Sequence, residues 1–470
     1  MTTMQGETPF ANGKRILLCV HQFFPHFSAG TEVLTLSTAQ ALRDEGYIVE
    51  IVTAQLQGEE NLSLASYDHE GFRVHQLLVP YVAGKFSSTT LVDEYNNRAV
   101  YAPFKSLLDH FQPNLVHFFH FKNLTISALQ ACVDKNIPTV YTPTDYWINC
   151  RSCQLVKPWG QNECSGPSLL ASNCLKHVAI NNQKGTMRRL LAHTPQVLFS
   201  ALMLAASAPI NTRFKNIMLA MKDLRNREQT IAQAMLKIDK ILPPTLFIEH
   251  LLINAGIPQH KIRRLKYGIQ PPIIYPVDLD RIKATGKTPT IGFIGTLTNH
   301  KGCHVLLQAI KQLPNMDADV VIYGDTQQNP DYVKNLDGII QNDPRVRFMG
   351  TFPHERIGSV LHSLDVLVIP STWRENAPLV LLNALACGTP IIASDVTGIT
   401  EYLGEKDNVT VFEPGNAEEL AQSLRSCLAL NNEHAHNHGA GRIAGEPLHA
   451  YISVLSGVYA DLMQIHEKLE

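Results

Sequence analysis

The segment PSTWRENAPLVLLNALACGTPIIASD, residues 370–395, places a glutamate directly before a predicted helix. Glu375 lies between a Pro-Ser-Thr-Trp stretch that ends a predicted strand and an Asn-Ala-Pro stretch that is typical of a helix start. A carboxylate there can accept hydrogen bonds from sugar hydroxyls, and the free N–H groups of the first helical turn can receive a phosphate. Acids also complement the helix dipole at this position, so a binding role and a purely local role both fit.

Two further loops carry residues that suit an anionic ligand. In FIGTLTNHKG, residues 293–302, Lys301 follows a predicted strand and can neutralise a diphosphate, although a surface lysine beside a glycine turn fits equally. In FFPHFSAGTEV, residues 23–33, Gly30 precedes a predicted helix whose free N–H groups can hold an anion. The alternative for this second loop is a plain turn between a strand and a helix.

Four of the nine cysteines fall within one short stretch. They are Cys150, Cys153, Cys164 and Cys174. The first two form a C-x2-C pair, the third follows after ten residues, and the fourth follows after nine more. Four thiolates at such a spacing can close a tetrahedral zinc site. We expect a structural zinc without a catalytic role, and the alternative is a loop with four free thiols.

Length and composition limit the classes of protein that need to be considered. A chain of 470 residues is too long for one ordinary core, so two domains are expected. The net charge of −2 gives no general attraction to nucleic acid. No stretch reaches the roughly 20 apolar residues of a membrane-spanning helix, and the first fifteen residues lack the apolar core of a signal peptide. We therefore expect a cytoplasmic protein with reduced thiols.

The elements that must position these residues follow an alternating pattern in both halves of the chain. Apolar runs that suit buried parallel strands are RILLCV, YIVEIVT, NLVHFFH and PTVYT in the first half, and TIGFIG, DVVIYG, VRFMG, DVLVIP, PIIASD and VTVFE in the second. Helical patterns separate several of them, for example TEVLTLSTAQALRDEG and HVLLQAIKQL. The pattern predicts an α/β protein with two doubly wound, Rossmann-like domains that face a cleft.

Residues 176–240 fit neither predicted sheet. They contain eleven Lys or Arg against three acids, a net charge of +8, in helix-forming sequence with apolar runs. The segment is predicted to be a helical insertion. Its basic face either is simply solvated or contacts an anionic membrane surface.

Taken together, FFPHFSAGTEV, GTLTNHKG and PSTWRENAPLVLLNALACGTPIIASDVTGITEYL resemble the retaining GT-B glycosyltransferases of family 4. The resemblance covers about residues 14–155 and 236–430. It implies a GT-B fold with two domains. The acceptor-side domain would cover residues 14–270 and include the basic insertion at about 176–240, and the nucleotide-sugar-binding domain would cover residues 271–449. A final helix over residues 450–470 would cross back to the first domain.

The resemblance also implies roles for individual residues. Lys301 would bind the diphosphate of the sugar donor, and Glu375 would hold hydroxyls of the transferred sugar. Gly30 would let the N-terminal loop close over the phosphates. The backbone beside the phosphates would be that of Ala377, Pro378, Leu379 and Val380. The donor would be a nucleotide-diphospho sugar, and no metal or other cofactor would be needed for catalysis.

Three positions depart from the family's pattern. Asn383 stands where a second acid usually holds the ribose, and its amide can bond to hydroxyls without charge assistance. Thr296 stands where an arginine often contacts phosphate, and Thr144 stands where a histidine is common near the donor sugar. His120, at the end of the preceding strand, is a candidate to compensate.

The expected function is the transfer of a sugar, with retention, to a glycan or a lipid-linked acceptor in cell-surface polysaccharide biosynthesis. Two alternatives stay open: a sugar-nucleotide epimerase of the same fold, and a degenerate GT-B module that only binds. The expected location is the cytoplasm, either free or attached to the inner face of the cell membrane.

Overall fold

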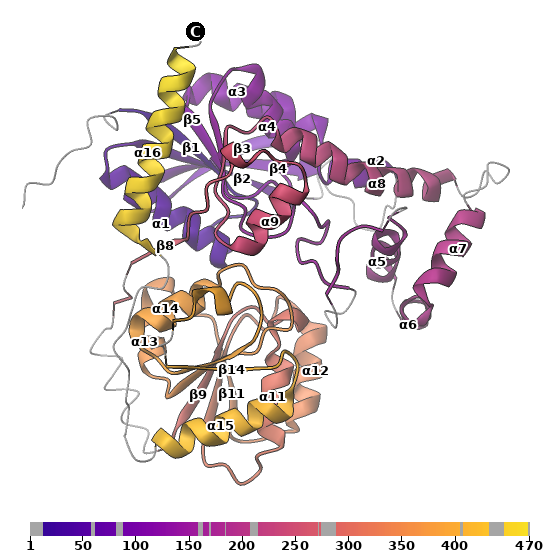
Figure 1. Ribbon diagram of the computed structural model, residues 1–470, viewed down its shortest axis with the longest axis vertical. Coiled ribbons are helices and arrows are strands. Elements are labelled where there is room, and N and C mark those ends of the chain that lie inside the picture. Colours follow the sequence, from indigo (N-terminus) through magenta and orange to yellow (C-terminus); the bar gives the residue numbers. More distant parts are fainter. Residues whose placement is uncertain are drawn as a thin grey trace, which may run out of the picture. The chain divides into compact units, whose positions relative to one another are not determined.

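The computed structural model describes residues 13–57, 62–80, 88–157, 163–168, 171–183, 185–206, 215–270, 272–273, 288–404, 408–431 and 446–468. These residues form two compact units, each built around its own sheet (Figure 1). Unit 1 comprises the described residues within 1–158, 164–265 and 449–470, and unit 2 those within 159–163 and 266–448. The predicted α/β class with two doubly wound domains is confirmed.

Unit 1 contains a seven-stranded sheet in the order β3-β4-β2-β1-β5-β6-β7. Its strands are β1 (Arg15–Cys19), β2 (Ile48–Gln57), β3 (Ser63–His69), β4 (Phe72–Pro80), β5 (Leu115–Phe118), β6 (Thr139–Tyr141) and β7 (Lys240–Ile241). Neighbouring strands are parallel except for the pair β3–β4. The central strands β1 and β5 are buried on both faces, which is why their sequences are almost continuously apolar.

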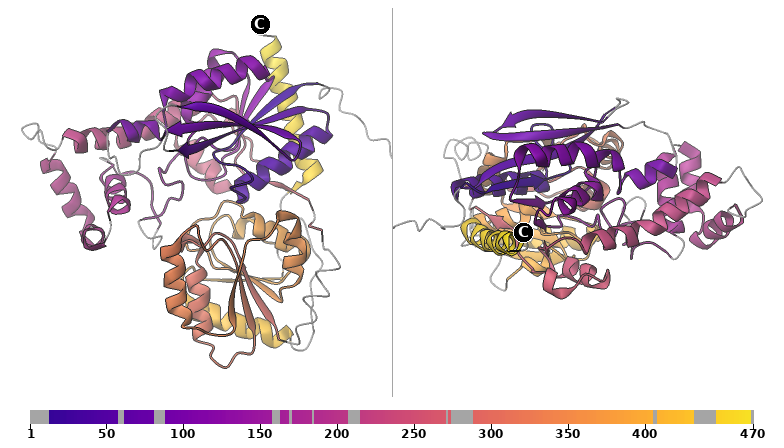
Figure 2. Two further views of the ribbon diagram at one scale, coloured as in Figure 1. Left: turned by 180° about the vertical axis from the view of Figure 1, so that it is seen from behind. Right: turned by 90° about the horizontal axis from the view of Figure 1, so that it is seen from above.

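The sheet of unit 1 is covered by helices on its two faces (Figures 1 and 2). These helices include α1 (Gly30–Asp44), α3 (Tyr101–Phe111), α4 (Thr125–Asp134), α9 (Leu246–Asn254) and α16 (Leu448–Glu467). The spacing that predicted α1 is the spacing of its buried face, since Val33, Leu36, Ala39 and Leu42 are all buried.

The last helix of the chain, α16, packs against unit 1 although unit 2 precedes it in sequence. Its Tyr459 hydroxyl lies 2.6 Å from Nδ1 of His117 on β5, and the other ring nitrogen of His117 lies 2.9 Å from the Thr142 hydroxyl. Burial lowers the pKa of His117 to about 3, so the ring is neutral at pH 7 and both of its nitrogens have partners. Lys14 and Glu467 form an ion pair near the end of the helix, at 2.8 Å.

The predicted helical insertion is present within unit 1 as α5 (Ser172–Asn182), α6 (Gly185–His193), α7 (Gln196–Ala206) and α8 (Lys215–Met235). Helices α5, α7 and α8 share a small core of their own with α2 (Ser88–Asp93). The buried members of this core are Leu91, Ala171, Leu175, Val178, Ala220, Met221 and Leu224.

Unit 2 contains a six-stranded, fully parallel sheet in the order β11-β10-β9-β12-β13-β14. Its strands are β9 (Thr290–Ile294), β10 (Asp319–Tyr323), β11 (Val346–Gly350), β12 (Val366–Ile369), β13 (Ile391–Ser394) and β14 (Val409–Phe412). Each corresponds to one of the six apolar runs predicted in the second half of the sequence.

The helices of unit 2 are α11 (Cys303–Lys311), α12 (Pro330–Ile340), α13 (Ile357–His362), α14 (Leu379–Cys387) and α15 (Ala417–Asn431). α11 packs against both α12 and α15, and α13 packs against α14. Two short parallel strands, β8 (Gly268–Ile269) and β15 (Glu446–Pro447), pair with each other. Within the described residues, no helix combines the length and the apolar character that crossing a membrane requires.

Candidate active site

One cluster of ionisable groups in unit 2 lies beyond the carboxyl ends of two neighbouring strands. Lys301 ends a short 3-10 turn (Asn299–Lys301) after β9, and Glu375 lies in the loop between β12 and α14. Because β9 and β12 are adjacent and parallel, these two loops emerge at the same edge of the sheet. Ligands of open parallel sheets bind at this edge.

Lys301 and Glu375 form a direct ion pair. The Lys301 ammonium donates to both carboxylate oxygens of Glu375, at 2.8 and 3.0 Å, and the Ser371 hydroxyl donates to one of them at 2.6 Å. The Glu375 side chain is only 3% exposed, whereas that of Lys301 is 25% exposed. An ammonium has three N–H donors, so Lys301 can keep Glu375 and still bind an anion from solvent.

The electrostatics of the pair keep the carboxylate ionised. Burial raises the pKa of Glu375, but the Lys301 ammonium and the hydrogen bonds from Lys301, Ser371 and Trp373 outweigh burial and leave the pKa below its ordinary value. Burial and the neighbouring Lys301 lower the pKa of His300 to about 4, so its imidazole is neutral at pH 7. The His300 ring and the Lys301 ammonium both lie against the Trp373 indole, at 4.7 and 5.3 Å from its centroid.

Two glycines allow the loops of this cluster to approach so closely. Gly302 has φ +73°, and a Cβ there would lie 1.7 Å from the Pro370 carbonyl oxygen. Gly398 has φ +85°, and a Cβ there would lie 1.9 Å from the Glu375 carbonyl oxygen. Both positions thus exclude a side chain for reasons of conformation and of space.

The residues that open α14 follow Glu375 directly. Ala377 is buried with φ +52°, a left-handed conformation that non-glycine residues seldom adopt and that strained loops at functional sites often contain. The sequence predicted Pro378 in the first turn, but the helix begins one residue later and Pro378 is its N-cap. The amides of Leu379 and Val380 open the helix, where no carbonyl of a preceding turn can accept from them. Asn383 is buried one turn further on.

Sequence reasoning assigned no role to three neighbours of Glu375. Ser371 reads as the end of a buried strand, and Trp373 and His300 read as ordinary loop residues. Their position beside a candidate acid was the only available signal.

Thr296 lies half-buried in the loop between β9 and Lys301.

The predicted residues of the N-terminal loops lie in unit 1. Gly30 is the first residue of α1 and is exposed. The Thr144 hydroxyl donates to the Phe119 carbonyl at 3.0 Å, so this residue bonds to the backbone of its own unit. His120 is buried and lies 2.6 Å from a carboxylate oxygen of Asp145.

His120, Asp145 and Cys153 are the one group within the described residues whose ligand-type atoms all lie within 4.8 Å of one another. The Lys122 backbone N–H donates to Nδ1 of His120 at 2.9 Å, which assigns the proton of the neutral ring to Nε2. That N–H then donates to Asp145, and neither ring nitrogen has a lone pair left for a cation. The geometry therefore fits a hydrogen-bonded His–Asp pair better than a metal site.

The four clustered cysteines lie near one another, since Cys150 is an electrostatic neighbour of both Cys153 and Cys174. Cys153 lies in the group with His120 and Asp145, whereas burial and the nearby Cys150 and Cys164 raise the pKa of Cys174 to about 12. None of the four forms a disulfide. Among the described residues the four sulfurs do not form one closed ligand set.

The zinc site stays a prediction, and metal analysis of the purified protein checks it. We expect about one zinc per chain. We also expect Cys174→Ser to lower both the metal content and the melting temperature, because thiolate sites contribute directly to folding. Cys427→Ser is the matched control, since Cys427 is another half-buried thiol, on α15 of unit 2. If the purified protein contains no metal and is equally stable, the zinc prediction is wrong and the four cysteines are ordinary thiols.

Comparison with known families gives two matches in the order of the two units. The family described as "Glycosyl transferase 4-like domain" matches residues 29–169, and "Glycosyl transferases group 1" matches residues 278–442. The second match contains both Lys301 and Glu375. The chain belongs to glycosyltransferase family 4.

Curated relatives of this family 4 chain include three glycosyltransferases. The 2-deoxystreptamine glucosyltransferase of Streptomyces kanamyceticus is 29% identical over 33% of this chain and 41% of that protein. A D-inositol 3-phosphate glycosyltransferase of Corynebacterium aurimucosum is 27% identical over 38% and 44%. The amylovoran biosynthesis glycosyltransferase AmsK of Erwinia amylovora is 27% identical over 39% and 46%. The matched segments thus span less than half of each relative.

Solved structures resemble the family 4 chain over nearly its full length. HepE of Anabaena, in complex with UDP and glucose, has a TM-score of 0.58 at 15% identity and covers 94% of this chain and 98% of its own. The sucrose-phosphate synthase of Thermosynechococcus elongatus has a TM-score of 0.60 at 16% identity and covers 97% and 99%. At these identities the likeness shows the fold, which is GT-B.

Proposed function

We propose that this chain transfers a sugar from a nucleotide-diphospho sugar to a glycan or lipid-linked acceptor, with retention, in the synthesis of a cell-surface polysaccharide. The observation that carries the proposal is the Lys301–Glu375 pair at the carboxyl ends of β9 and β12, directly before α14. It puts a partly exposed cation beside a buried, ionised carboxylate. A nucleotide-diphospho sugar carries both phosphates and hydroxyls. The cation suits the phosphates, and the carboxylate suits the hydroxyls.

In this proposal the groups of unit 2 hold the donor and stabilise its leaving group. The diphosphate contacts Lys301 and the amides of Leu379 and Val380, while Glu375 accepts hydrogen bonds from the sugar hydroxyls. The bond from the anomeric carbon to the phosphate oxygen breaks, and a bond to the acceptor oxygen forms on the same face. The acceptor's hydroxyl proton passes to the departing phosphate. No enzymic nucleophile and no metal take part.

The names of the relatives guide the choice of substrates to test. HepE has been solved with UDP-glucose as well as with UDP, which makes UDP-sugars the first donors to try. AmsK is named for the biosynthesis of amylovoran, which supports a polysaccharide acceptor. We further place the reaction in the cytoplasm, with the basic segment of residues 176–240 against the inner face of the membrane, where a lipid-linked acceptor would lie.

Asn383→Glu is expected to tighten binding of the nucleotide sugar about fivefold. If the position faces ribose, a carboxylate makes stronger bonds to two hydroxyls than an amide does, by about 1 kcal/mol. Isothermal titration with donor measures the effect, and Asn383→Gln controls for the added length without the charge. Unchanged or weaker binding in Asn383→Glu would show that the residue has another task.

A degenerate binding module is the second candidate, because Asn383, Thr296 and Thr144 all replace charged or ionisable family residues with neutral ones. Incubation with a panel of nucleotide sugars separates the possibilities. Release of nucleoside diphosphate, with the sugar transferred to water or to an added acceptor, supports a transferase. Donor binding without turnover indicates a module, and an interconverted sugar indicates an epimerase.

A further inference from the structure

Helix α7 exposes apolar side chains that a water-facing helix normally lacks. Its sequence is QVLFSALMLAA, in which Gln196 and Ser200 are the only polar residues. Val197 is 82% exposed, and Leu198, Leu202 and Leu204 are each about half exposed, at 51%, 52% and 51%. A helix that is apolar on all sides belongs in a core or in lipid, and large exposed apolar patches mark interaction surfaces.

This exposure is built into the local packing, because α7 is held by one face only. Phe199 is buried, and Met203 packs against the small core that α5 shares with α8. Between them, the Ser200 hydroxyl lies 2.8 Å from that of Ser172 at the start of α5. The buried ring and the hydrogen-bonded serines fix the orientation of α7, and the remaining faces turn their leucines and valine outward.

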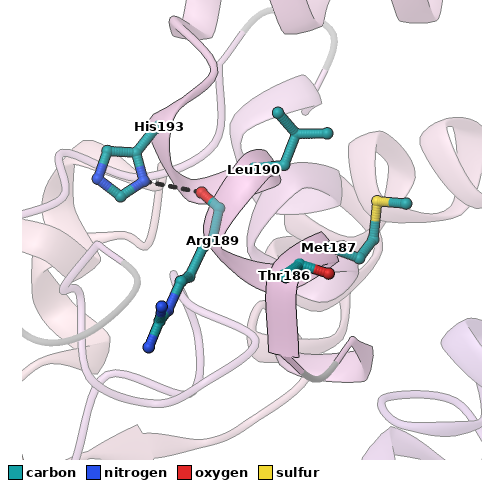
Figure 3. Close-up of a pocket in the computed structure, with 5 residues that line it drawn as sticks. All are labelled: Thr186, Met187, Arg189, Leu190 and His193. Carbon is teal, nitrogen blue, oxygen red and sulfur yellow. Dashed lines mark hydrogen bonds between the residues drawn. The ribbon is translucent and has the colours of Figure 1, made fainter.

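The preceding helix, α6, adds positive charge and more apolar surface. Met187 and Leu190 are 50% and 64% exposed and extend to one side of α6, whereas Arg189 and His193 extend to the other (Figure 3). With Thr186 they line a shallow, open hollow of about 460 Å³. The His193 ring donates through Nδ1 to the Arg189 carbonyl at 2.8 Å, which leaves Nε2 turned away from the helix backbone. Residues 185–206 contain two arginines and no acid.

We infer that α6 and α7 are the surface by which this protein enters the interface of an anionic phospholipid bilayer. α7 has eleven residues, a length of about 16 Å, which is too short to span a bilayer and suits a helix lying in its plane. Its leucines reach the acyl boundary, and Arg189 lies at the level of the headgroup phosphates. Charge favours lipid over a protein partner, since the whole segment 176–240 carries +8.

This inference extends the proposed membrane location, but its test needs no sugar donor or acceptor. The full chain is sedimented with vesicles of phosphatidylcholine alone and of phosphatidylcholine mixed with phosphatidylglycerol, at low and at high salt. We expect binding to the anionic vesicles at least tenfold tighter than to the neutral ones, and weaker at high salt because exposed charges are screened. The variant Leu198→Ser/Leu202→Ser should lose at least tenfold of the anionic binding. Arg189→Gln should weaken binding to the anionic vesicles by a smaller factor, and chiefly at low salt.

The control is Ile253→Ser/Ile465→Ser, which removes two exposed apolar side chains of unit 1 on α9 and α16. It should bind anionic vesicles like the unchanged protein. Equal melting temperatures show that each variant is folded, as expected for exposed positions. Equal binding by the two double variants, or equal binding to both kinds of vesicle, would overturn the inference. So would a dimer in light scattering that dissociates in Leu198→Ser/Leu202→Ser while vesicle binding is absent.

Discussion

We expect Glu375→Gln to lower the rate of sugar transfer by a factor of at least about 100 and to leave the protein folded. The carboxylate is buried, is held ionised by Lys301, and lies where the proposal puts the sugar hydroxyls. Glutamine keeps an oxygen that can accept from Ser371 but removes the charge that strengthens bonds to hydroxyls as the transition state forms. Steady-state release of nucleoside diphosphate from the donor identified in the panel measures the effect.

The matched control is Glu355→Gln, which neutralises an exposed acid of the same unit in the short turn before α13. Its turnover should equal that of the unchanged enzyme. Donor affinity is measured in parallel, because a loss in turnover that exceeds the loss in binding indicates a role in the transition state. Near-normal turnover in Glu375→Gln would remove this residue from the proposed mechanism.

We expect Gly302→Ala to destabilise unit 2 by at least about 3 kcal/mol. The new Cβ would lie 1.7 Å from the Pro370 carbonyl oxygen, far inside contact distance, so either the turn after Lys301 or the end of β12 must move. The positive φ adds a smaller conformational cost. Chemical denaturation followed by circular dichroism measures the change in the free energy of unfolding.

Gly415→Ala separates the two costs. Gly415 has φ +82°, close to that of Gly302, but an added Cβ would meet no atom within 4 Å. We expect this variant to lose only about 1 kcal/mol. Similar losses in the two variants would mean that the approach of Gly302 to Pro370 contributes little to the stability of unit 2.

The two sheets could be predicted from sequence because parallel strands that are buried on both faces leave unbroken apolar runs, such as RILLC in β1 and VLVI in β12. The antiparallel pair β3–β4 was missed. Its turn, Glu70-Gly71, has positive φ at both residues, as a tight hairpin requires, but a glutamate in place of Asn or Asp gives a weak sequence signal. β7 is only two residues long and offers no periodicity to read.

The candidate site was predictable in part. The order of the loops placed Lys301 and Glu375 near the same sheet edge, but their direct contact joins residues 74 positions apart and depends on the adjacency of β9 and β12. The left-handed Ala377 could not be foreseen, because nothing in its type indicates a positive φ. The cysteine spacing likewise carried no information on His120 and Asp145, which come from the ends of other strands to meet Cys153.

The return of α16 to unit 1 has a consequence for taking the protein apart. Apart from the short segment 159–163, which is grouped with unit 2 but belongs to the first stretch of chain, the chain passes between the units near residue 265 and again near residue 448. The short strands β8 and β15, which pair in unit 2, lie just inside these two points. One protease cut at either point leaves the halves covalently joined, so separating them takes two. A gene fragment that stops at residue 265 would lack Tyr459, so His117 would lose that hydrogen-bond partner. A fragment of residues 266–448 would carry a complete parallel sheet. The second unit is therefore the fragment to express alone, and the first needs the terminal helix restored through an engineered linker.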